Sequence, residues 1–383
     1  MTINKKKYIP CGRQSIDEDD IQAVVEVLRS DYLTTGPKVA EFEKAVADCV
    51  GVKYAVAVSS GTAALHCAMY ALGIGPGDEV IVPPMTFAAT ANCVVYQGGT
   101  PVFADVEEDT LLIDPAEVEK KITPRTKAII GVDYAGQPCD WDSLRAIADK
   151  YNLAFVADGC HALGAEYKGR RVGSLADMTA FSFHPVKHIT TGEGGMITTD
   201  NPEYTQKLKL FRNHGIATDH HQREEKGTWF YEMLDLGYNY RITDFQCALG
   251  ISQLKKLPAF LARRQQIAAM YGEGFQDDPT IIPLTCNNEI FHAYHLYVVK
   301  VARKPGREMI FNYLRAAGIA VNIHYIPVHL HPFYRTIYGY EKGSYPVAEA
   351  AYDQILSLPI WPGLSDEQVD FVLKSIQLIL EKS

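Results

Sequence analysis

The chain has 383 residues, a formal net charge of −9 and eight cysteines. At roughly 100–200 residues per domain, this length predicts two or three domains. Apolar residues make up 47% of the chain and charged residues 22%, which is ordinary for a folded, soluble protein. The acidic balance argues against a general nucleic-acid-binding protein, because neutralising phosphates requires clustered cations.

The sequence contains no signal for a membrane or for export. No apolar run approaches the roughly 20 residues of a membrane span, and the lysines near the N-terminus are not followed by the apolar stretch of a signal peptide. The cysteines form no CxxC pair of the kind found in metal and redox sites. Buried free thiols in a reducing compartment are the simpler interpretation, so we expect a cytoplasmic protein without a metal site.

Helical and strand patterns alternate through the first two-thirds of the chain. Apolar residues at helical spacing predict helices at 21–28, 42–49, 65–72, 88–96 and 144–151. Short apolar runs predict strands at 54–58, 79–82, 101–106, 128–132, 153–157, 179–183 and 196–199. This alternation is typical of βαβ units, so we predict an α/β fold with a large, mostly parallel sheet.

The pattern changes after about residue 243. The stretch 244–275 is predicted to be largely helical, with a break or kink at Pro258. Beyond it we predict strands at 295–301 and 320–323 and helices at 307–317, 347–356 and 366–380. These elements predict a smaller α+β domain at 251–383, with residues 1–13 packing on it and residues 14–250 forming the large domain.

The first motif with functional potential is Ser59–His66, which follows a predicted strand and opens a helix. Parallel sheets bind their ligands at the carboxyl ends of strands. Exposed amides and hydroxyls at a helix N-terminus can bind an anion. The alternative is an ordinary helix cap, since Ser and Thr are favoured there in any case.

Asp158 and Lys187 also follow predicted strands. A carboxylate at the end of a buried strand is costly unless it meets a cation or a donor. Asp158 therefore suits a protonated heterocyclic nitrogen, with a helix cap or a structural ion pair as the alternative. Lys187 lies among apolar residues and glycines, which makes it a candidate for a lowered pKa and for a Schiff base with a carbonyl cofactor. A solvated loop lysine is the alternative.

Together these motifs resemble the DegT/StrS family of sugar-nucleotide aminotransferases, which are fold-type I pyridoxal-phosphate enzymes. The resemblance covers nearly the whole chain, through the segments 32–37, 59–66, 83–87, 157–165, 182–195, 212–215 and 236–244. It implies an α/β fold-type I aminotransferase architecture with pyridoxal 5'-phosphate as the cofactor.

The resemblance also implies roles for individual residues. Lys187 would form the Schiff base with the cofactor and later move the proton between substrate and cofactor. Asp158 would pair with the pyridinium nitrogen and keep it protonated. Phe87 would stack on the ring, and His161 would lie near the opposite face or the phenolic oxygen. The phosphate would be bound by Gly61, Thr62 and Ala63 at the start of the helix and by Ser182 near the end of a strand.

The family further implies a homodimer with shared active sites, in which Asn239 or Arg241 of the partner subunit reaches the cofactor phosphate. Relatives that dehydrate sugars carry His where this chain has Lys187, so transamination is favoured. The donor in the family is usually L-glutamate.

Three segments, 182–195, 229–233 and 322–329, most resemble aminotransferases that act at C4 of UDP-linked 4-keto-6-deoxy sugars in pseudaminic acid synthesis. His324, Tyr325 and His329 are the candidates for sugar contact. GDP-4-keto-6-deoxymannose or another 3- or 4-keto nucleotide sugar is the alternative substrate. A catalytically silent protein that binds pyridoxal phosphate is a further alternative, against which the intact Lys187 and Asp158 argue.

Overall fold

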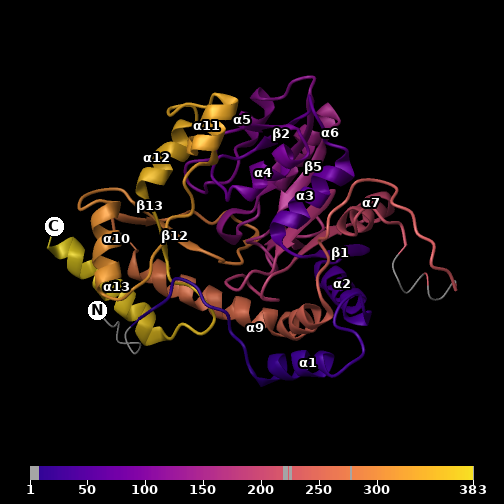
Figure 1. The fold of residues 1–383 in the computed structure, drawn as a ribbon. Coiled ribbons are helices and arrows are strands. Elements are labelled where there is room, and N and C mark those ends of the chain that lie inside the picture. The colour runs from indigo at the N-terminus through magenta and orange to yellow at the C-terminus, as the bar shows by residue number, and fades with distance from the viewer. Residues whose placement is uncertain (1–7, 219–222, 224–226, 277, 383) are drawn as a thin grey trace.

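A seven-stranded sheet forms the centre of the molecule (Figure 1). The computed structural model describes residues 8–218, 223, 227–276 and 278–382. In sheet order the strands are β1 (Tyr54–Val58), β9 (Gly195–Thr199), β8 (Met178–Ser182), β5 (Ala154–Asp158), β4 (Thr126–Val132), β2 (Glu79–Val82) and β3 (Thr100–Phe103). Strand β9 runs antiparallel to both neighbours and the other pairings are parallel. The predicted α/β class with a mostly parallel sheet is therefore confirmed.

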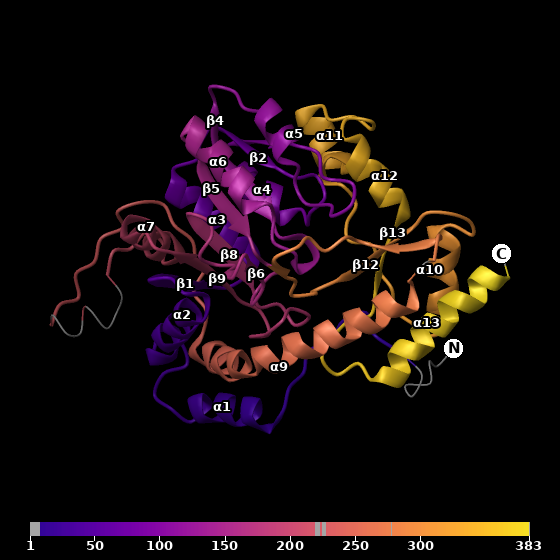
Figure 2. The same ribbon diagram turned by 180° about the vertical axis from the view of Figure 1, so that it is seen from behind.

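Helices surround this sheet (Figures 1 and 2). They are α2 (Pro37–Val50), α3 (Gly61–Leu72), α4 (Ala89–Tyr96), α5 (Pro115–Lys120), α6 (Trp141–Tyr151) and α7 (Pro202–Arg212). Helix α1 (Glu18–Leu28) packs instead against α9 (Asp244–Gly274). Helix α3 packs against β8 and β9 and is buried over most of its length. It begins at Ser60, whose hydroxyl accepts a hydrogen bond from the Ala63 amide, and ends at Gly73 in the left-handed conformation. These caps place the start of α3 at the carboxyl edge of the sheet.

The long helix α9 (Asp244–Gly274) links the two ends of the molecule (Figure 2). It begins with a capping box formed by Thr243 and Gln246. Of the predicted break or kink at Pro258, the break is wrong, because the helix continues through this residue, and the kink stays a prediction. Proline removes one backbone donor, but Leu257 and Leu261 on either side are buried in the core and hold the helix together.

The C-terminal region has a three-stranded antiparallel sheet of β10 (Ile281–Pro283), β12 (Tyr297–Val301) and β13 (Ile355–Leu358). Its helices are α10 (Arg307–Ala316), α11 (Pro332–Tyr338), α12 (Pro346–Gln354) and α13 (Asp366–Glu381). A small separate sheet joins β6 (Glu166–Tyr167), β7 (Arg170–Arg171) and β11 (Ile290–Phe291).

Two predictions for this region need correction. The predicted strand 320–323 is not formed, because only isolated bridges occur there, at Ile319 and Asn322. The predicted helix 347–356 ends at Gln354, because the buried residues that follow pair with β12 as strand β13.

The buried apolar residues form two clusters. The larger surrounds the central sheet, and the smaller lies between the antiparallel sheet, α10 and α13. Ile9 belongs to the smaller cluster and bridges to Ile319. Residues 1–7 of the predicted N-terminal segment lie outside the described residues. The proposed boundary at 250/251 falls inside α9, and the domain division stays a prediction.

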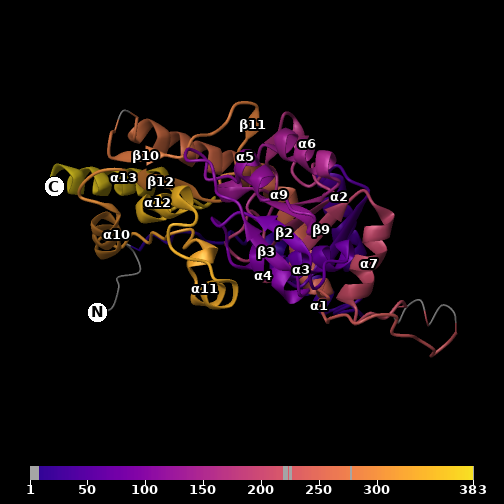
Figure 3. The same cartoon turned by 90° about the horizontal axis from the view of Figure 1, so that it is seen from above.

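Between α7 and α9, the described residues on both sides of the segment 219–226 extend away from the rest of the molecule (Figures 1 and 3). They expose large apolar side chains at Trp229, Phe230, Tyr231, Met233, Leu234 and Leu236. Among the described helices, none is long and apolar enough to cross a membrane.

Candidate active site

A cavity of about 480 Å³ opens at the carboxyl edge of the central sheet. Strands β5 and β8 and the start of α3 form one wall, and the segment 322–325 forms part of the other. Nine predicted site residues line it: Gly61, Thr62, Phe87, Asp158, His161, Ser182, Lys187, His324 and Tyr325. Its size falls within the range of small-molecule sites.

Asp158 is the last residue of β5 and is buried at the base of the cavity. One carboxylate oxygen accepts a hydrogen bond from Thr90 Oγ1 at 2.7 Å, and the other accepts one from the Cys160 amide at 3.2 Å. The described residues supply no cation as a salt-bridge partner. A buried carboxylate without a cation is suited to binding a protonated ring nitrogen.

Lys187 follows β8 and is partly buried in the cavity wall. Burial lowers the pKa of its amine, while Cys160 and Asp158 oppose this shift. Among the described residues, the amine makes one hydrogen-bond contact, with His295 Nε2 at 3.4 Å. An amine with a lowered pKa is more often neutral and is therefore more nucleophilic at physiological pH.

The start of α3 lies against the end of β8. A Cβ atom on Gly61 would lie 2.9 Å from the Cβ of Ser182 and 3.0 Å from Cys160 Sγ, so the close packing here requires glycine. The first amides of a helix have no partner within the helix. The opening at Gly61 and Thr62, with the Ser182 hydroxyl beside it, therefore suits an anion such as a phosphate.

Aromatic and neutral polar side chains from both walls also line the cavity. Phe87 is 60% exposed, and its ring centre lies 6.0 Å from that of Tyr325. The Tyr325 hydroxyl lies 3.1 Å from His161 Nε2. Burial lowers the pKa of His324 to about 4 and lowers that of His161 well below its ordinary value. Both rings are therefore neutral near pH 7.

These features fit the expected pyridoxal phosphate. A partly buried lysine amine, a buried carboxylate without a cation, an exposed aromatic face and a helix N-terminus surround one cavity. They match the aldehyde, ring nitrogen, ring face and phosphate of the cofactor, respectively. In the part of the chain that the structure describes, no group of His, Cys, Asp and Glu is arranged to hold a metal ion.

Four predicted residues do not line the cavity. The Ala63 amide donates to Ser60 Oγ at 3.1 Å, so in this conformation it is not available to a phosphate. Asn239 and Arg241 lie outside the cavity of their own chain, and Arg241 Nη1 donates to Asn213 Oδ1 at 2.8 Å. Their predicted role in a partner's site stays a prediction.

His329, the third predicted sugar contact, does not line the cavity. Its side chain is fully buried, and Nε2 lies 2.9 Å from Glu349 Oε1. The ring also packs against Tyr345 with centroids 4.7 Å apart. The short helical turn at Val328–Leu330 carries this ring, and its predicted contact with the sugar gains no support from this arrangement.

The sequence interpretation missed His295, Thr90 and Cys160. His295 lies just before β12 and lines the cavity beside Lys187. Cys160 stands between two predicted site residues in the printed sequence, and that position was the available signal. Thr90 lies within a predicted helix, where nothing local indicates that its hydroxyl meets Asp158.

Comparisons with known proteins agree with this geometry. The model of the DegT/DnrJ/EryC1/StrS aminotransferase family matches residues 14–377. The chain is 43% identical over 386 residues to the spore coat polysaccharide biosynthesis protein SpsC of Bacillus subtilis, covering 100% of this chain and 99% of that protein.

Two solved structures show the same fold. Spr1654 of Streptococcus pneumoniae, a candidate sugar aminotransferase in its PMP form, is 36% identical with a TM-score of 0.93, covering 98% of this chain and 99% of that one. Helicobacter pylori PseC, an aminotransferase involved in the biosynthesis of pseudoaminic acid, is 35% identical with a TM-score of 0.92, covering 98% and 100%. The predicted fold-type I aminotransferase architecture is confirmed. PseC is one of several solved structures at about this identity, so the comparison does not favour its activity over those of the others.

Proposed function

Because the chain belongs to the DegT/DnrJ/EryC1/StrS family and is a pyridoxal-phosphate-dependent sugar aminotransferase, we propose that it transfers an amino group from L-glutamate to C4 of a UDP-linked 4-keto-6-deoxy-N-acetylhexosamine. One observation carries the chemistry of this proposal: Lys187, Asp158 and the start of α3 lie around a single cavity. The resemblance of segments 182–195, 229–233 and 322–329 supports the choice of sugar.

When bound, pyridoxal phosphate supplies an electron-accepting ring that carries the amino group between the two substrates. Asp158 holds the proton on the ring nitrogen, because a buried carboxylate favours a cation beside it. The amides of Gly61 and Thr62 and the Ser182 hydroxyl hold the phosphate. Phe87 covers one face of the ring.

Lys187 Nζ acts as the general base and acid in both halves of the reaction. It removes the proton from Cα of L-glutamate, which leaves as 2-oxoglutarate. In the second half it delivers a proton to C4 of the sugar, whose keto oxygen leaves as water. The lowered pKa of the amine suits this role, because a catalytic base must be neutral at the working pH.

His324 and Tyr325 are placed to orient the sugar. Both residues belong to the segment 322–325 that lines the cavity, and the Tyr325 amide donates to Met85 Sδ at 3.4 Å. His324 Nδ1 bonds to Ser357 Oγ at 2.8 Å, and Nε2 bonds to Asn322 Nδ2 at 3.2 Å. These two bonds hold the imidazole in one orientation.

The substrate is tested with a panel of keto nucleotide sugars, each incubated with L-glutamate. We expect the UDP-linked 4-keto-6-deoxy-N-acetylhexosamine to give a 4-amino product, identified by NMR, and 2-oxoglutarate in equal amount. Amination of GDP-4-keto-6-deoxymannose or of a 3-keto sugar instead would replace the proposed substrate with that compound. If L-glutamate yielded no 2-oxoglutarate with any sugar, glutamate would not be the donor.

The proposed homodimer has active sites that both subunits build. Asn239 and Arg241 do not line the cavity of their own chain, and the projecting segment next to them exposes several large apolar side chains. Exposed apolar clusters of this kind are typical of protein interfaces. Arg241 of the partner subunit would add a cation to the phosphate site, which contains no arginine of its own chain among the described residues.

Mixed dimers test this arrangement. Lys187→Ala and Arg241→Ala each damage one half of a shared site, so a mixed dimer contains one intact site. Random mixing of the two inactive variants should restore about a quarter of the wild-type activity. Sites built within single chains would predict no restoration, and a monomer in sedimentation experiments would contradict the proposal directly.

A further inference from the structure

We infer that His295 is a positioning residue for Lys187, whose imidazole accepts a hydrogen bond from the free lysine amine and holds it toward the cavity. The distance from Lys187 Nζ to His295 Nε2 is 3.4 Å. The described residues offer this amine no other hydrogen-bond partner. The inference rests on the proposed role of Lys187 in the reaction.

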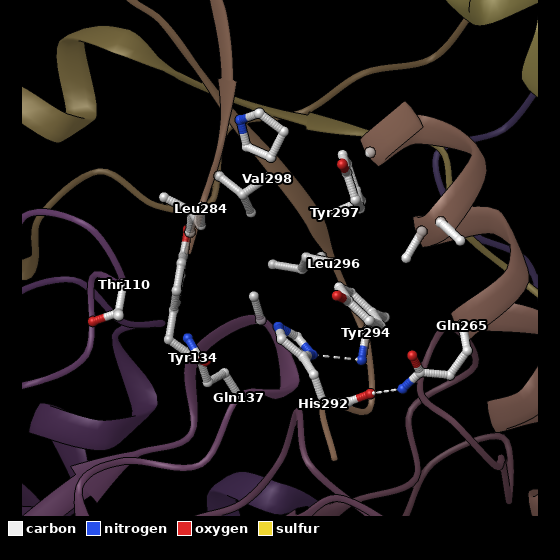
Figure 4. Close-up of a pocket in the computed structure, with 15 residues that line it drawn as sticks. Thr110, Tyr134, Gln137, Gln265, Leu284, His292, Tyr294, Leu296, Tyr297 and Val298 are labelled. Atoms are coloured by element: carbon white, nitrogen blue, oxygen red, sulfur yellow. Dashed lines mark hydrogen bonds between the residues drawn. The ribbon is translucent and has the colours of Figure 1, made fainter. Parts of the chain in front are cut away.

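The fold allows His295 little freedom. The chain bends just before β12, where Tyr294 has a left-handed φ of 46°. His292, Tyr294 and Leu296 line a second cavity behind the active site (Figure 4), whereas His295 faces Lys187. The His295 carbonyl accepts a bond from Arg264 Nη1 at 3.3 Å.

Backbone bonds fix the same segment to the large sheet. The amide of Ala293 donates to the Gly136 carbonyl at 2.9 Å, and that of Leu296 donates to the Ala135 carbonyl at 3.1 Å. The His295 ring packs against His161, with centroids 4.4 Å apart. The ring also lies 5.7 Å from that of His188. A fixed backbone and packed neighbouring rings let the imidazole hold a flexible lysine in one orientation.

The charge of His295 suits this role. Its side chain is buried, and burial together with the cations beside it lowers its pKa well below the ordinary value. A neutral imidazole that accepts a hydrogen bond adds no negative charge, so it leaves a neutral amine with its lone pair available. The other groups that face the lysine are Cys160, Asp158, Arg264, His161, His188 and His324.

Three substitutions separate positioning from packing. His295→Leu removes the acceptor but keeps an apolar side chain, whereas His295→Gln can keep an acceptor near the position of Nε2. His295→Glu adds a negative charge beside the amine. The matched control is His292→Asn in the same segment, because Asn Oδ1 can replace the Nδ1 that accepts from the Tyr294 amide at 2.8 Å.

The experiment uses the full-length protein loaded with pyridoxamine phosphate, in which the lysine amine is not bonded to the cofactor. The rate of Lys187 acetylation by acetic anhydride is followed by peptide mass mapping across pH, which gives its apparent pKa. His295→Leu should lower this pKa by about one, because a charged amine gains more from an acceptor than a neutral one does. It should also lower kcat about tenfold with little change in KM.

His295→Gln should restore the pKa and most of kcat, His295→Glu should raise the pKa, and His292→Asn should change neither. Equal pKa values in the Leu and Gln variants would overturn the inference and leave only a packing role for His295. Failure of the underlying function is recognised separately: in the resting enzyme with pyridoxal phosphate, Lys187 would then react with acetic anhydride instead of being protected.

Discussion

The two walls of the active-site cavity differ in chemistry. The wall at the sheet edge carries charged groups, Asp158, Lys187 and Glu193, on segments tied to the seven-stranded sheet. The facing wall, formed by His295 and the segment 322–325, carries histidine, tyrosine and asparagine side chains and no carboxylate, lysine or arginine among its described residues. The difference indicates a division of labour: the first wall performs the chemistry, and the second orients flexible or variable groups.

The largest effect is expected at the sheet-edge wall, from Lys187→Ala. Without the amine, no group in the cavity replaces the base, so kcat should fall at least about a thousandfold. The measurement is glutamate-dependent formation of 2-oxoglutarate. Lys44→Ala is the control, since Lys44 is an exposed lysine paired with Asp48 on α2. An active Lys187→Ala variant would contradict the division between the walls.

Two aspartates at the ends of neighbouring strands provide a second test of the sheet-edge wall. Asp158 ends β5 in the cavity, whereas Asp133 follows β4 directly and is fully buried outside it. Burial raises the pKa of Asp133 to about 8, so it is largely protonated at pH 7. We expect Asp158→Asn to lower kcat about a hundredfold, because the ring nitrogen loses its anionic partner.

Asp133→Asn, in contrast, exchanges a neutral group for another of similar shape. Its Oδ1 can still accept from the Cys139 amide, as the carboxyl does at 2.9 Å. Activity should change less than about threefold, since no charge is lost near the cofactor. An equal loss of activity in both variants would show that any buried carboxyl at a strand end is needed for activity, whether or not it lines the cavity.

The sequence predicts the sheet-edge wall well because its rules are local. Apolar strands and periodic helices identify the sheet, and ligands bind where parallel strands end. Asp158 and Lys187 could therefore be proposed from their position after a strand. Thr90 could not, because its contact with Asp158 joins residues far apart in the chain, and local patterns carry no such information.

The facing wall depends on packing over long sequence distances. His295 stands at the start of an ordinary predicted strand, and nothing local shows that it meets a residue 108 positions earlier. His324 and His329 lie in one segment, yet one lines the cavity and the other is fully buried. The turn at Val328–Leu330 and the hydrogen bond between His329 and Glu349 decide this outcome, and the spacing of the two histidines indicates neither.

These two histidines offer the next test. His329→Ala should destabilise the protein by about 3 kcal/mol, because it leaves the mostly buried Glu349 carboxylate without its imidazole partner. Urea unfolding measures this loss, and the KM of the surviving enzyme should be unchanged. His324→Ala should raise the KM for the sugar about tenfold with little loss of stability. If His329→Ala instead raised the KM for the sugar and His324→Ala lowered the stability, the sugar contact would belong to His329.

The smallest expected effect concerns the neutral histidines and pH. Burial lowers the pKa of His292 to about 3, whereas an unfolded histidine has a pKa near 6.5. Below pH 6.5 the unfolded chain therefore binds a proton that the folded chain does not, so stability falls as the pH falls. His292 alone should account for a loss of about 2 kcal/mol between pH 7 and pH 5.

Urea unfolding at the two pH values measures this loss in the wild type and in His292→Asn. The variant should lose about 2 kcal/mol less on acidification, because asparagine does not titrate. Substitution of the exposed His214 by Gln should leave the difference unchanged. His324, with a pKa lowered to about 4, should contribute to the acid response in the same way as His292. An identical acid response in wild type and His292→Asn would mean that this histidine is not held neutral by burial.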